Sequence, residues 1–229
     1  MSAEATNVVV LSAGVSDPSS TRLLADRAAS KVVDELRAQR REPSVGVIEL
    51  APLAVDVAAA LVGGVRSAEL DATIERLAAA DVLIVSTPVY KAGPSGLLKA
   101  FVDLLDNDLL VGTTVILAAT AGTARHALVV DAQLRELFAF LRAVAVPTAL
   151  FAAPEDWSDP ALTARIERAA AEAAILAGSR QAIRERTWAG HRHEFGSGAA
   201  APGGAGDVDF DTDLMRLATG GSAPPRRRR

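Results

Sequence analysis

Short apolar runs alternate along the chain with longer segments in which apolar residues recur every three or four positions. The short runs are rich in β-branched residues and lack polar alternation. They therefore predict five buried strands, at residues 8–11, 45–50, 82–85, 115–119 and 146–151. The longer segments place charge opposite an apolar face and predict helices over residues 21–38, 68–79, 96–105, 128–141 and 160–182.

Strands that alternate with helices in this way are typical of parallel βαβ units. We therefore expect an α/β fold with a doubly wound, parallel, five-stranded sheet that is covered on both faces. Ligands of such a sheet bind outside the carboxyl ends of the strands. Residues 51–64, which are rich in alanine and valine, predict a long connection with room for a helical turn.

The composition of the chain changes after Ala189. The segment GHRHEFGSGAAAPGGAG is rich in glycine and alanine and has no sustained period, which predicts a largely flexible tail. We expect a domain over residues 1–188, followed by this extension over residues 189–229. Within the extension, DFDTDLMRLATGG predicts a short amphipathic helix that docks on its own or a neighbouring subunit, and PPRRRR forms a small basic end.

The bulk composition narrows the class of function. The 229 residues are 50% hydrophobic and 23% charged, which is enough apolar material for one substantial core. The net charge of -4 favours small molecules or proteins as partners over nucleic acid or an anionic membrane. Cysteine is absent, so any redox chemistry falls to a cofactor. With no signal-peptide pattern and no apolar run long enough for a membrane span, we expect a cytoplasmic protein.

Hydroxyl side chains cluster where the first strand gives way to a helix. The segment LSAGVSDPSSTRLLADRAA lacks both the GxGxxG and the GxxxxGK[ST] patterns. Hydroxyls at a helix N-terminus, where N–H groups are unpaired and carry partial positive charge, suit the oxygens of a phosphate monoester. A purely structural alternative is that Asp17 or Ser19 caps the helix. The candidate binding residues in this loop are Ser12, Ser19, Ser20, Thr21 and Arg22, with Ser16 in the same cluster.

The third strand leads into TPVYKAGPSGLLKAFVDLL, which contains the only tyrosine of the chain, Tyr90. Its glycines permit close approach of the backbone, and the residues displayed above the sheet edge are Pro88, Val89, Tyr90 and Lys91. An isoalloxazine ring needs an apolar surface for its face and backbone partners for its polar edge, and such a loop offers both. Alternatively, Tyr90 is an ordinary amphipathic surface residue.

The fourth strand ends in ATAGTARHALVVD, again small and hydroxylic before a helix. We expect a third contact loop there, formed by Thr120, Ala121, Gly122 and Thr123. His126 is more typical of a surface or capping residue than of a catalytic base, and the His191 and His193 pair in the tail does not make a metal site. Because the carboxyl ends of the first, third and fourth strands meet in the predicted sheet, the three loops converge on the crevice where this strand order binds FMN.

With these motifs, the chain resembles the NAD(P)H-dependent FMN reductases of the flavodoxin-like superfamily. It is most similar to the reductases that serve alkanesulfonate and other luciferase-like monooxygenases. The resemblance covers about residues 7–157 and is most specific in TPVYKAGPSGLLKAFVDLL and ATAGTARHALVVDAQL. It implies the flavodoxin-like strand order 2-1-3-4-5, with FMN and either NADPH or NADH as cofactors. It also implies a homodimer or homotetramer that supplies reduced FMN to a separate monooxygenase.

The resemblance also implies a role for each loop. The first loop would hold the phosphate and ribityl end of FMN, the second would line the isoalloxazine, and the third would close its other edge. Hydride would pass directly between the two cofactors, without a side-chain acid or base. Some of these reductases carry a tyrosine insertion that forms a π-helix in the fourth helix. Here Asp131 is followed by Ala132, so the sequence does not predict oligomer switching or flavin hand-off through such a π-helix.

Three other functions fit part of the same pattern. A flavoprotein that retains FMN would reduce quinones, azo compounds or metal ions. A flavodoxin-type electron carrier would flank the ring with aromatic residues and surround it with acidic ones. This chain offers only Tyr90 there. A flavin-free interaction protein would use the tail for its contacts.

Overall fold

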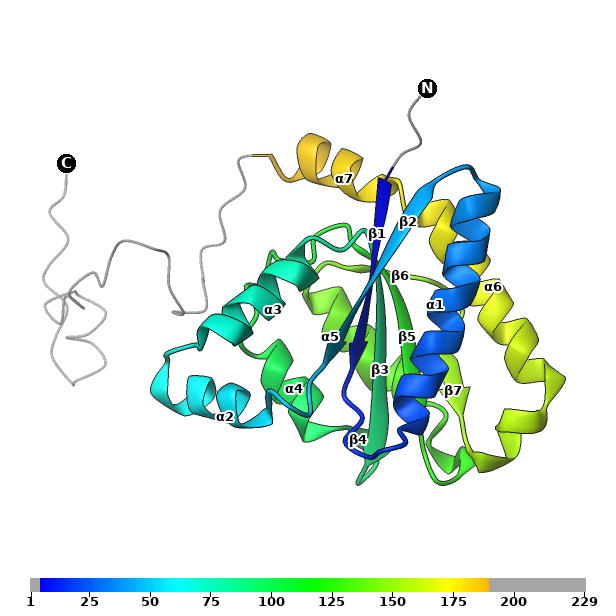
Figure 1. The fold of residues 1–229 in the computed structure, drawn as a ribbon, viewed down its shortest axis with the longest axis horizontal. Helices are drawn as coiled ribbons and strands as arrows, with labels where there is room; N and C mark the ends of the chain where they lie inside the picture. The colour runs from blue at the N-terminus through cyan, green and yellow to red at the C-terminus, as the bar shows by residue number, and fades with distance from the viewer. Residues whose placement is uncertain (1–4, 190–229) are drawn as a thin grey trace, which may run out of the picture. The chain divides into compact units, whose positions relative to one another are not determined.

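Parallel strands run through the centre of the molecule, with helices on both sides (Figure 1). This computed structural model describes residues 5–189. The strands are β1 (Ala5–Ser12), β2 (Glu42–Glu49), β3 (Val82–Tyr90), β5 (Thr114–Thr120), β6 (Val144–Ala145) and β7 (Leu150–Ala152), and β4 (Gly93–Pro94) turns back on β3. The sheet order is β2-β1-β3-β5-β6, and β7 also pairs with β5. When only the parallel strands are counted in chain order, with β6 and β7 together as the fifth, this is the order 2-1-3-4-5. The predicted α/β flavodoxin-like order is therefore confirmed.

Each central strand sends alternate residues into two separate cores. Val8 and Val10 of β1 pack with α1 (Ser20–Ala38) and α6 (Pro160–Leu176), which lie on one side of the sheet. Val9 and Leu11 face the other side, where the core contains residues of α2 (Ala54–Gly63), α3 (Ala68–Ala78), α4 (Gly96–Val102) and α5 (Arg135–Phe140). Burial on both faces explains why these strands read as continuous apolar runs in the sequence.

The strands at the two edges of the sheet differ from the prediction. The edge strand β2 is largely exposed, with Val45 48% exposed, so this strand is not covered on both faces. Residues 146–149 of the predicted strand at residues 146–151 are not in a strand, and they separate β6 from β7, because Pro147 has no N–H to give to a ladder. In the gap, Arg135 donates to the Val146 carbonyl at 3.0 Å, and the Thr148 N–H and hydroxyl both donate to the Glu172 carboxylate at 2.8 Å.

Two helical segments also differ from the prediction. Residues 54–63 form the full helix α2 where a connection with a helical turn was expected. The helix predicted over residues 160–182 is divided by Gly178 into α6 and α7 (Ser179–Thr187). The guanidinium of Arg180 on α7 donates to the Ala78 and Ala80 carbonyls at the end of α3, and burial lowers its pKa. These contacts fasten α7 to the domain.

The predicted helix at residues 128–141 has a different internal geometry. A 3-10 turn, η1 (Ala124–His126), is followed by a π-helix, η2 (Val130–Leu134), and then by α5. A π-helix is therefore present here although Asp131 is followed by Ala132 and not by an inserted tyrosine. The Arg135 N–H donates to the Val130 carbonyl, five residues back. One extra residue in the turn produces this pattern, so it does not require tyrosine at that position.

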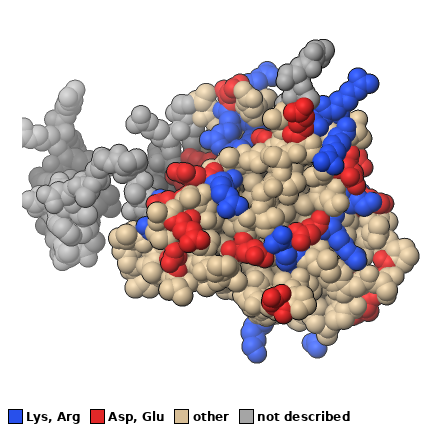
Figure 2. Space-filling model, in the orientation of Figure 1, with Lys and Arg blue, Asp and Glu red and all other residues tan. Residues whose placement is uncertain are grey.

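Other predictions concern the tail and the surface. Three of them lie outside the described residues or at their end: the domain boundary near residue 189, the DFDTDLMRLATGG helix, and the His191 and His193 pair. Within residues 5–189, no helix is both long and apolar enough to cross a membrane. In the same range, no group of three or more histidine, aspartate or glutamate residues could hold a metal ion. Acidic and basic side chains are interspersed on the face drawn in Figure 2.

Candidate functional site

The carboxyl ends of β1, β3 and β5 meet at a cavity of about 280 Å³. Parallel register brings them together, because Ser12 lies opposite Ser86 and Pro88 lies opposite Thr120. The loops after these strands therefore share one edge of the sheet. The cavity is lined by Gly14, Val15, Ser16, Ser20, Thr21, Pro88, Val89, Tyr90, Thr120, Ala121, Gly122 and Pro154.

A buried pair of hydroxyls joins the first and third of these loops. Thr21 Oγ1 lies 2.7 Å from Thr120 Oγ1, and both threonines are buried. The hydroxyl of Ser86 on β3 donates to the Thr21 carbonyl at 2.8 Å. The start of α1 is thus tied to the middle of β3 and to the end of β5, beside the cavity.

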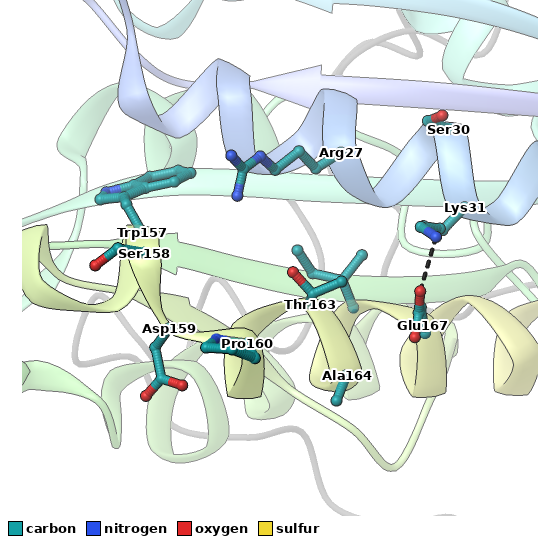
Figure 3. A pocket seen from close by; sticks show the side chains of 11 residues that line it. Arg27, Ser30, Lys31, Trp157, Ser158, Asp159, Pro160, Thr163, Ala164 and Glu167 are labelled. Atoms are coloured by element: carbon teal, nitrogen blue, oxygen red, sulfur yellow. Dashed lines mark hydrogen bonds and ion pairs between the residues drawn. The ribbon is translucent and has the colours of Figure 1, made fainter.

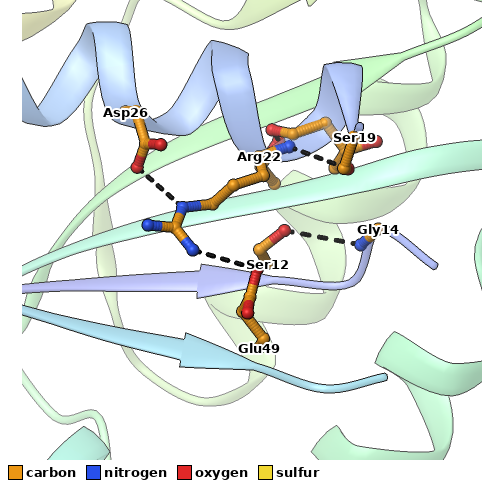
Figure 4. A network of polar contacts seen from close by, with 8 residues as sticks. Ser12, Gly14, Ser19, Arg22, Asp26 and Glu49 are labelled. Atoms are coloured by element: carbon orange, nitrogen blue, oxygen red, sulfur yellow. Dashed lines mark hydrogen bonds and ion pairs between the residues drawn. The ribbon is translucent and has the colours of Figure 1, made fainter. Parts of the chain in front are cut away.

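The N-terminus of α1 opens into this cavity. Ser19 is the N-cap, and its Oγ accepts a hydrogen bond from the Arg22 N–H at 3.2 Å (Figure 4). The first intrahelical bond runs from the Leu23 N–H to the Ser19 carbonyl at 3.0 Å. The preceding N–H groups of Ser20 and Thr21 therefore have no partner inside the helix. Together with the helix dipole, they provide a site for an anionic oxygen.

The side chain of Arg22 turns away from the cavity. Its Nε donates to Asp26 at 2.7 Å and its Nη1 to Glu49 at 2.9 Å, so that the guanidinium lies between α1 and β2 (Figure 4). The hydrogen bond to Asp26 is the main cause of a raised Arg22 pKa, and Glu49 adds to it. Arg22 therefore remains charged but is held by these carboxylates.

Tyr90 ends β3 and begins a tight hairpin. It pairs with Gly93 of β4, which leaves Lys91 and Ala92 as the two turn residues, with φ of 50° and 64°. Positive φ at both positions is the geometry of a type I′ turn, in which residues other than glycine, asparagine and aspartate are unfavourable. At the base of the hairpin, Thr87 Oγ1 accepts from the Ser95 N–H at 3.0 Å. Tyr90 is 51% exposed.

The structure brings most of the predicted site residues together. Eight of them line the cavity: Ser20, Thr21, Pro88, Val89, Tyr90, Thr120, Ala121 and Gly122. The other five do not line it: Ser12, Ser19, Arg22, Lys91 and Thr123. Ser12 is buried, and its hydroxyl accepts from the Gly14 N–H at 3.4 Å. Lys91 lines a separate hollow of about 690 Å³ beside α5, which Tyr90 also borders.

Three lining residues were not noted in the sequence, namely Gly14, Val15 and Pro154, and Ser16 was noted in the hydroxyl cluster but was not among the predicted binding residues. Gly14 had a signal in the sequence, because it is the only glycine in the loop between β1 and α1. A Cβ at this position would overlap Ser19 Oγ and lie 3.2 Å from Thr21 Cβ. The loop can therefore pass close to the helix cap because residue 14 has no side chain.

A different cavity, of about 610 Å³, lies between α1 and α6 (Figure 3). There the Arg27 guanidinium lies 5.3 Å from the centre of the Trp157 ring, and Lys31 forms an ion pair with Glu167 at 2.7 Å. Residues of the two helices and of the turn before α6 form its walls. It is larger than the cavity at the strand ends but does not include the loops that follow β1, β3 and β5.

The cavity at the strand ends is suited to a phosphorylated planar ring. The α1 N-terminus offers N–H groups to a phosphate, and Tyr90 with Pro88 and Val89 offers apolar surface to a ring. None of the twelve lining residues is aspartate, glutamate, histidine, lysine or arginine. The site can bind and orient, and the redox chemistry must belong to what it binds.

Known proteins similar to this chain are FMN reductases, which agrees with a cavity suited to a phosphorylated planar ring. The family described as NADPH-dependent FMN reductase matches residues 6–158. An FMN reductase (NADPH) of Pseudomonas aeruginosa is 40% identical over 182 residues, which are 77% of this chain and 95% of the relative. The NADH-dependent FMN reductase SfnE of Pseudomonas putida is 38% identical over 78% of this chain and 96% of its own length.

A solved structure agrees with these relatives. An oxidoreductase from Corynebacterium diphtheriae has 43% sequence identity and a TM-score of 0.73, and the match covers 81% of this chain and 100% of that chain. The match of residues 6–158 takes in all the lining residues of the cavity. The chain therefore belongs to the family of NADPH-dependent FMN reductases, enzymes with FMN and a nicotinamide nucleotide as their cofactors.

Proposed function

We propose that this chain supplies the reduced FMN that it makes, with NADPH or NADH as reductant, to a separate luciferase-like monooxygenase. In the reaction, the nicotinamide gives a hydride to FMN, a proton comes from water, and the products are oxidised nicotinamide nucleotide and reduced flavin. The observation that supports flavin reduction at this site is the convergence of the three loops on one cavity that has no acidic or basic lining residue.

The residues present fit FMN. The N–H groups of Ser20 and Thr21 would bind the phosphate, and Ser16 lines the same cavity. Pro88, Val89 and Tyr90 would pack on one side of the ring, and Thr120 to Gly122 would border its other edge. The N–H of Ala121 already donates to the Ala152 carbonyl at 3.1 Å, which fixes this border against β7.

Release of the product is supported by the exposure of the site. Tyr90 is 51% exposed, and Phe140, which lines the same hollow as Tyr90, is 65% exposed; Leu128 is 76% exposed. A ring bound beside Tyr90 would remain accessible to a nicotinamide and then to solvent. The exposed apolar side chains also support the homodimer or homotetramer that we propose for this chain. The monooxygenase partner rests on the sequence resemblance.

An anaerobic assay tests the proposed function. Purified full-length chain should oxidise NADPH or NADH rapidly when free FMN is added, and reduced flavin should pass through an ultrafiltration membrane that retains the protein. Light scattering on the same sample should give the mass of a dimer or tetramer. Turnover that is fast with quinone but slow with FMN would instead indicate a flavoprotein that retains its FMN. Failure to oxidise the nicotinamide despite flavin binding would indicate an electron carrier.

A substitution at Arg22 tests where the phosphate binds. Because its guanidinium is held by Asp26 and Glu49, Arg22→Met should change the Kd for FMN by no more than about threefold. It should lower the free energy of unfolding by about 1 kcal/mol or less, as partly exposed ion pairs contribute little. Fluorescence titration with FMN and urea unfolding give the two quantities.

Lys31→Met is the matched control, because Lys31 forms an ion pair with Glu167 farther along the same helix. A rise in Kd of about tenfold or more in Arg22→Met alone would show that Arg22 leaves its carboxylates and binds the phosphate.

A further inference from the structure

The π-helix η2 places one side chain on the turn that follows Tyr90. Gln133 Nε2 donates to the Ala92 carbonyl at 2.9 Å. A Cβ on Gly93 would lie 3.1 Å from Gln133 Oε1, so the side-chain amide lies closely along the turn. Because a carbonyl oxygen only accepts hydrogen bonds, the amide must present its nitrogen to Ala92.

The turn needs such a contact because its own residues do not favour its conformation. Lys91 and Ala92 both have positive φ, although neither is glycine or asparagine. The other end of the hairpin is already fixed, since Thr87 accepts from the Ser95 N–H and Ser95 caps α4 through the Leu98 N–H at 3.2 Å. At the tip, the hydrogen bond from Gln133 fixes the carbonyl of the second turn residue.

The π register determines where Gln133 points. Within the turn, the Ala132 N–H still donates to the Leu128 carbonyl at 2.8 Å, whereas the Arg135 N–H reaches back to Val130. The added residue rotates the positions between these bonds relative to a regular α-helix. An ion pair between Arg135 and Asp131, at 2.8 Å, spans the same turn. The π-helix thus presents Gln133 to the hairpin while Leu134 remains buried in the core.

We propose that Gln133 is a positioning residue, which holds the left-handed turn at Lys91 and Ala92 and thereby fixes Tyr90 at the flavin site. Its link to catalysis rests on the proposed function, whereas its link to the turn does not. Tyr90 borders both the cavity at the strand ends and the hollow that Gln133 lines. A turn that samples other conformations would move the Tyr90 ring and weaken its contact with a bound flavin.

Hydrogen exchange tests the structural part without any ligand. In flavin-free protein, Gln133→Ala should speed the exchange of amides in a peptide covering residues 88–96 by about fivefold or more, because the turn opens more often. Exchange in the central strand β5 should not change. Unchanged exchange at residues 88–96 would overturn the proposal, whether or not the protein binds flavin.

The functional part is tested with FMN. In Gln133→Ala, the Kd for FMN should rise about fivefold to tenfold and the KM for FMN should rise with it, while Tm should fall by less than about 2 °C. Gln133→Glu has the same shape but no amide donor, and its carboxylate would face the Ala92 carbonyl. This variant should therefore weaken FMN binding as Gln133→Ala does. Glu136→Ala, on the same exposed surface, is the control and should leave Kd unchanged.

A second substitution distinguishes positioning from a direct contact with flavin. Ala92→Gly removes the steric penalty of positive φ, so the double variant Ala92→Gly/Gln133→Ala should recover a Kd within about threefold of the wild type. No recovery would mean that Gln133 acts in another way and would overturn the proposal. If the wild-type chain itself does not bind FMN, the proposed function fails, and the exchange measurement alone decides the role of Gln133.

Discussion

The substitution Gly14→Ala is expected to weaken FMN binding about 30-fold or more, which corresponds to about 2 kcal/mol. The added methyl would overlap Ser19 Oγ and would crowd Ser19 Cβ and Thr21 Cβ, at 3.3 and 3.2 Å. Rotation of the Ser19 hydroxyl would relieve part of the overlap, but it would break the cap on the Arg22 N–H. Loss of a cap costs about 1 kcal/mol, and the remaining crowding must shift the loop away from the phosphate site.

Fluorescence titration with FMN and urea unfolding measure the two effects of Gly14→Ala. Ser19→Gly in the same chain should recover much of the lost affinity. It removes Ser19 Oγ and Cβ, which are two of the three atoms that the methyl meets, and glycine at an N-cap costs only about a few tenths of a kcal/mol relative to serine. Gly96→Ala is the matched control, since a Cβ there meets no heavy atom within 4 Å. If Gly14→Ala bound FMN as tightly as Gly96→Ala does, the phosphate could not lie at this loop.

The difference between Gly14 and Arg22 illustrates what the sequence can reveal about this site. The alternation of strands and helices follows from the apolar runs, and the strand order follows from the family resemblance. Together they place the three loops at one edge of the sheet, where the structure has both Thr120 and Tyr90 at one cavity. The direction of Arg22 depends on Glu49, which is distant in sequence, and the need for Gly14 depends on where Ser19 points. Such contacts exist only after the chain has folded.

The secondary-structure elements also divide into features that the sequence indicates and features that only the folded chain shows. Pro147 was visible in the sequence as a residue that cannot join a strand ladder, and it marks the break between β6 and β7. The π-helix had no such signal, because the buried positions Val130, Leu134, Phe138 and Leu141 are spaced three or four apart, as in a regular α-helix. The exposed edge of β2 also follows from topology, since nothing in the run of residues 45–50 states which strand lies outermost.

The substitution Thr87→Val is expected to lower the free energy of unfolding by about 2 kcal/mol, although valine has nearly the same shape as threonine. Thr87 is fully buried, and its Oγ1 accepts from the Ser95 N–H at 3.0 Å and donates to either the Pro88 carbonyl or Ser95 Oγ. Valine would leave the buried Ser95 N–H without its acceptor. It would also free the base of the hairpin that carries Tyr90, so FMN affinity should fall as well.

Thr114→Val provides the matched control for this prediction. Thr114 is as fully buried as Thr87, but its hydroxyl has no hydrogen-bond partner within the part of the chain that the structure describes. Replacing an unpaired buried hydroxyl with a methyl removes a desolvation cost, so Thr114→Val should be neutral or stabilise the protein by up to about 1 kcal/mol in urea unfolding. Equal destabilisation by the two variants would mean that lost packing, and not the hydrogen bond to Ser95, determines the effect. Opposite signs would show that one hydroxyl holds the Tyr90 hairpin to the sheet.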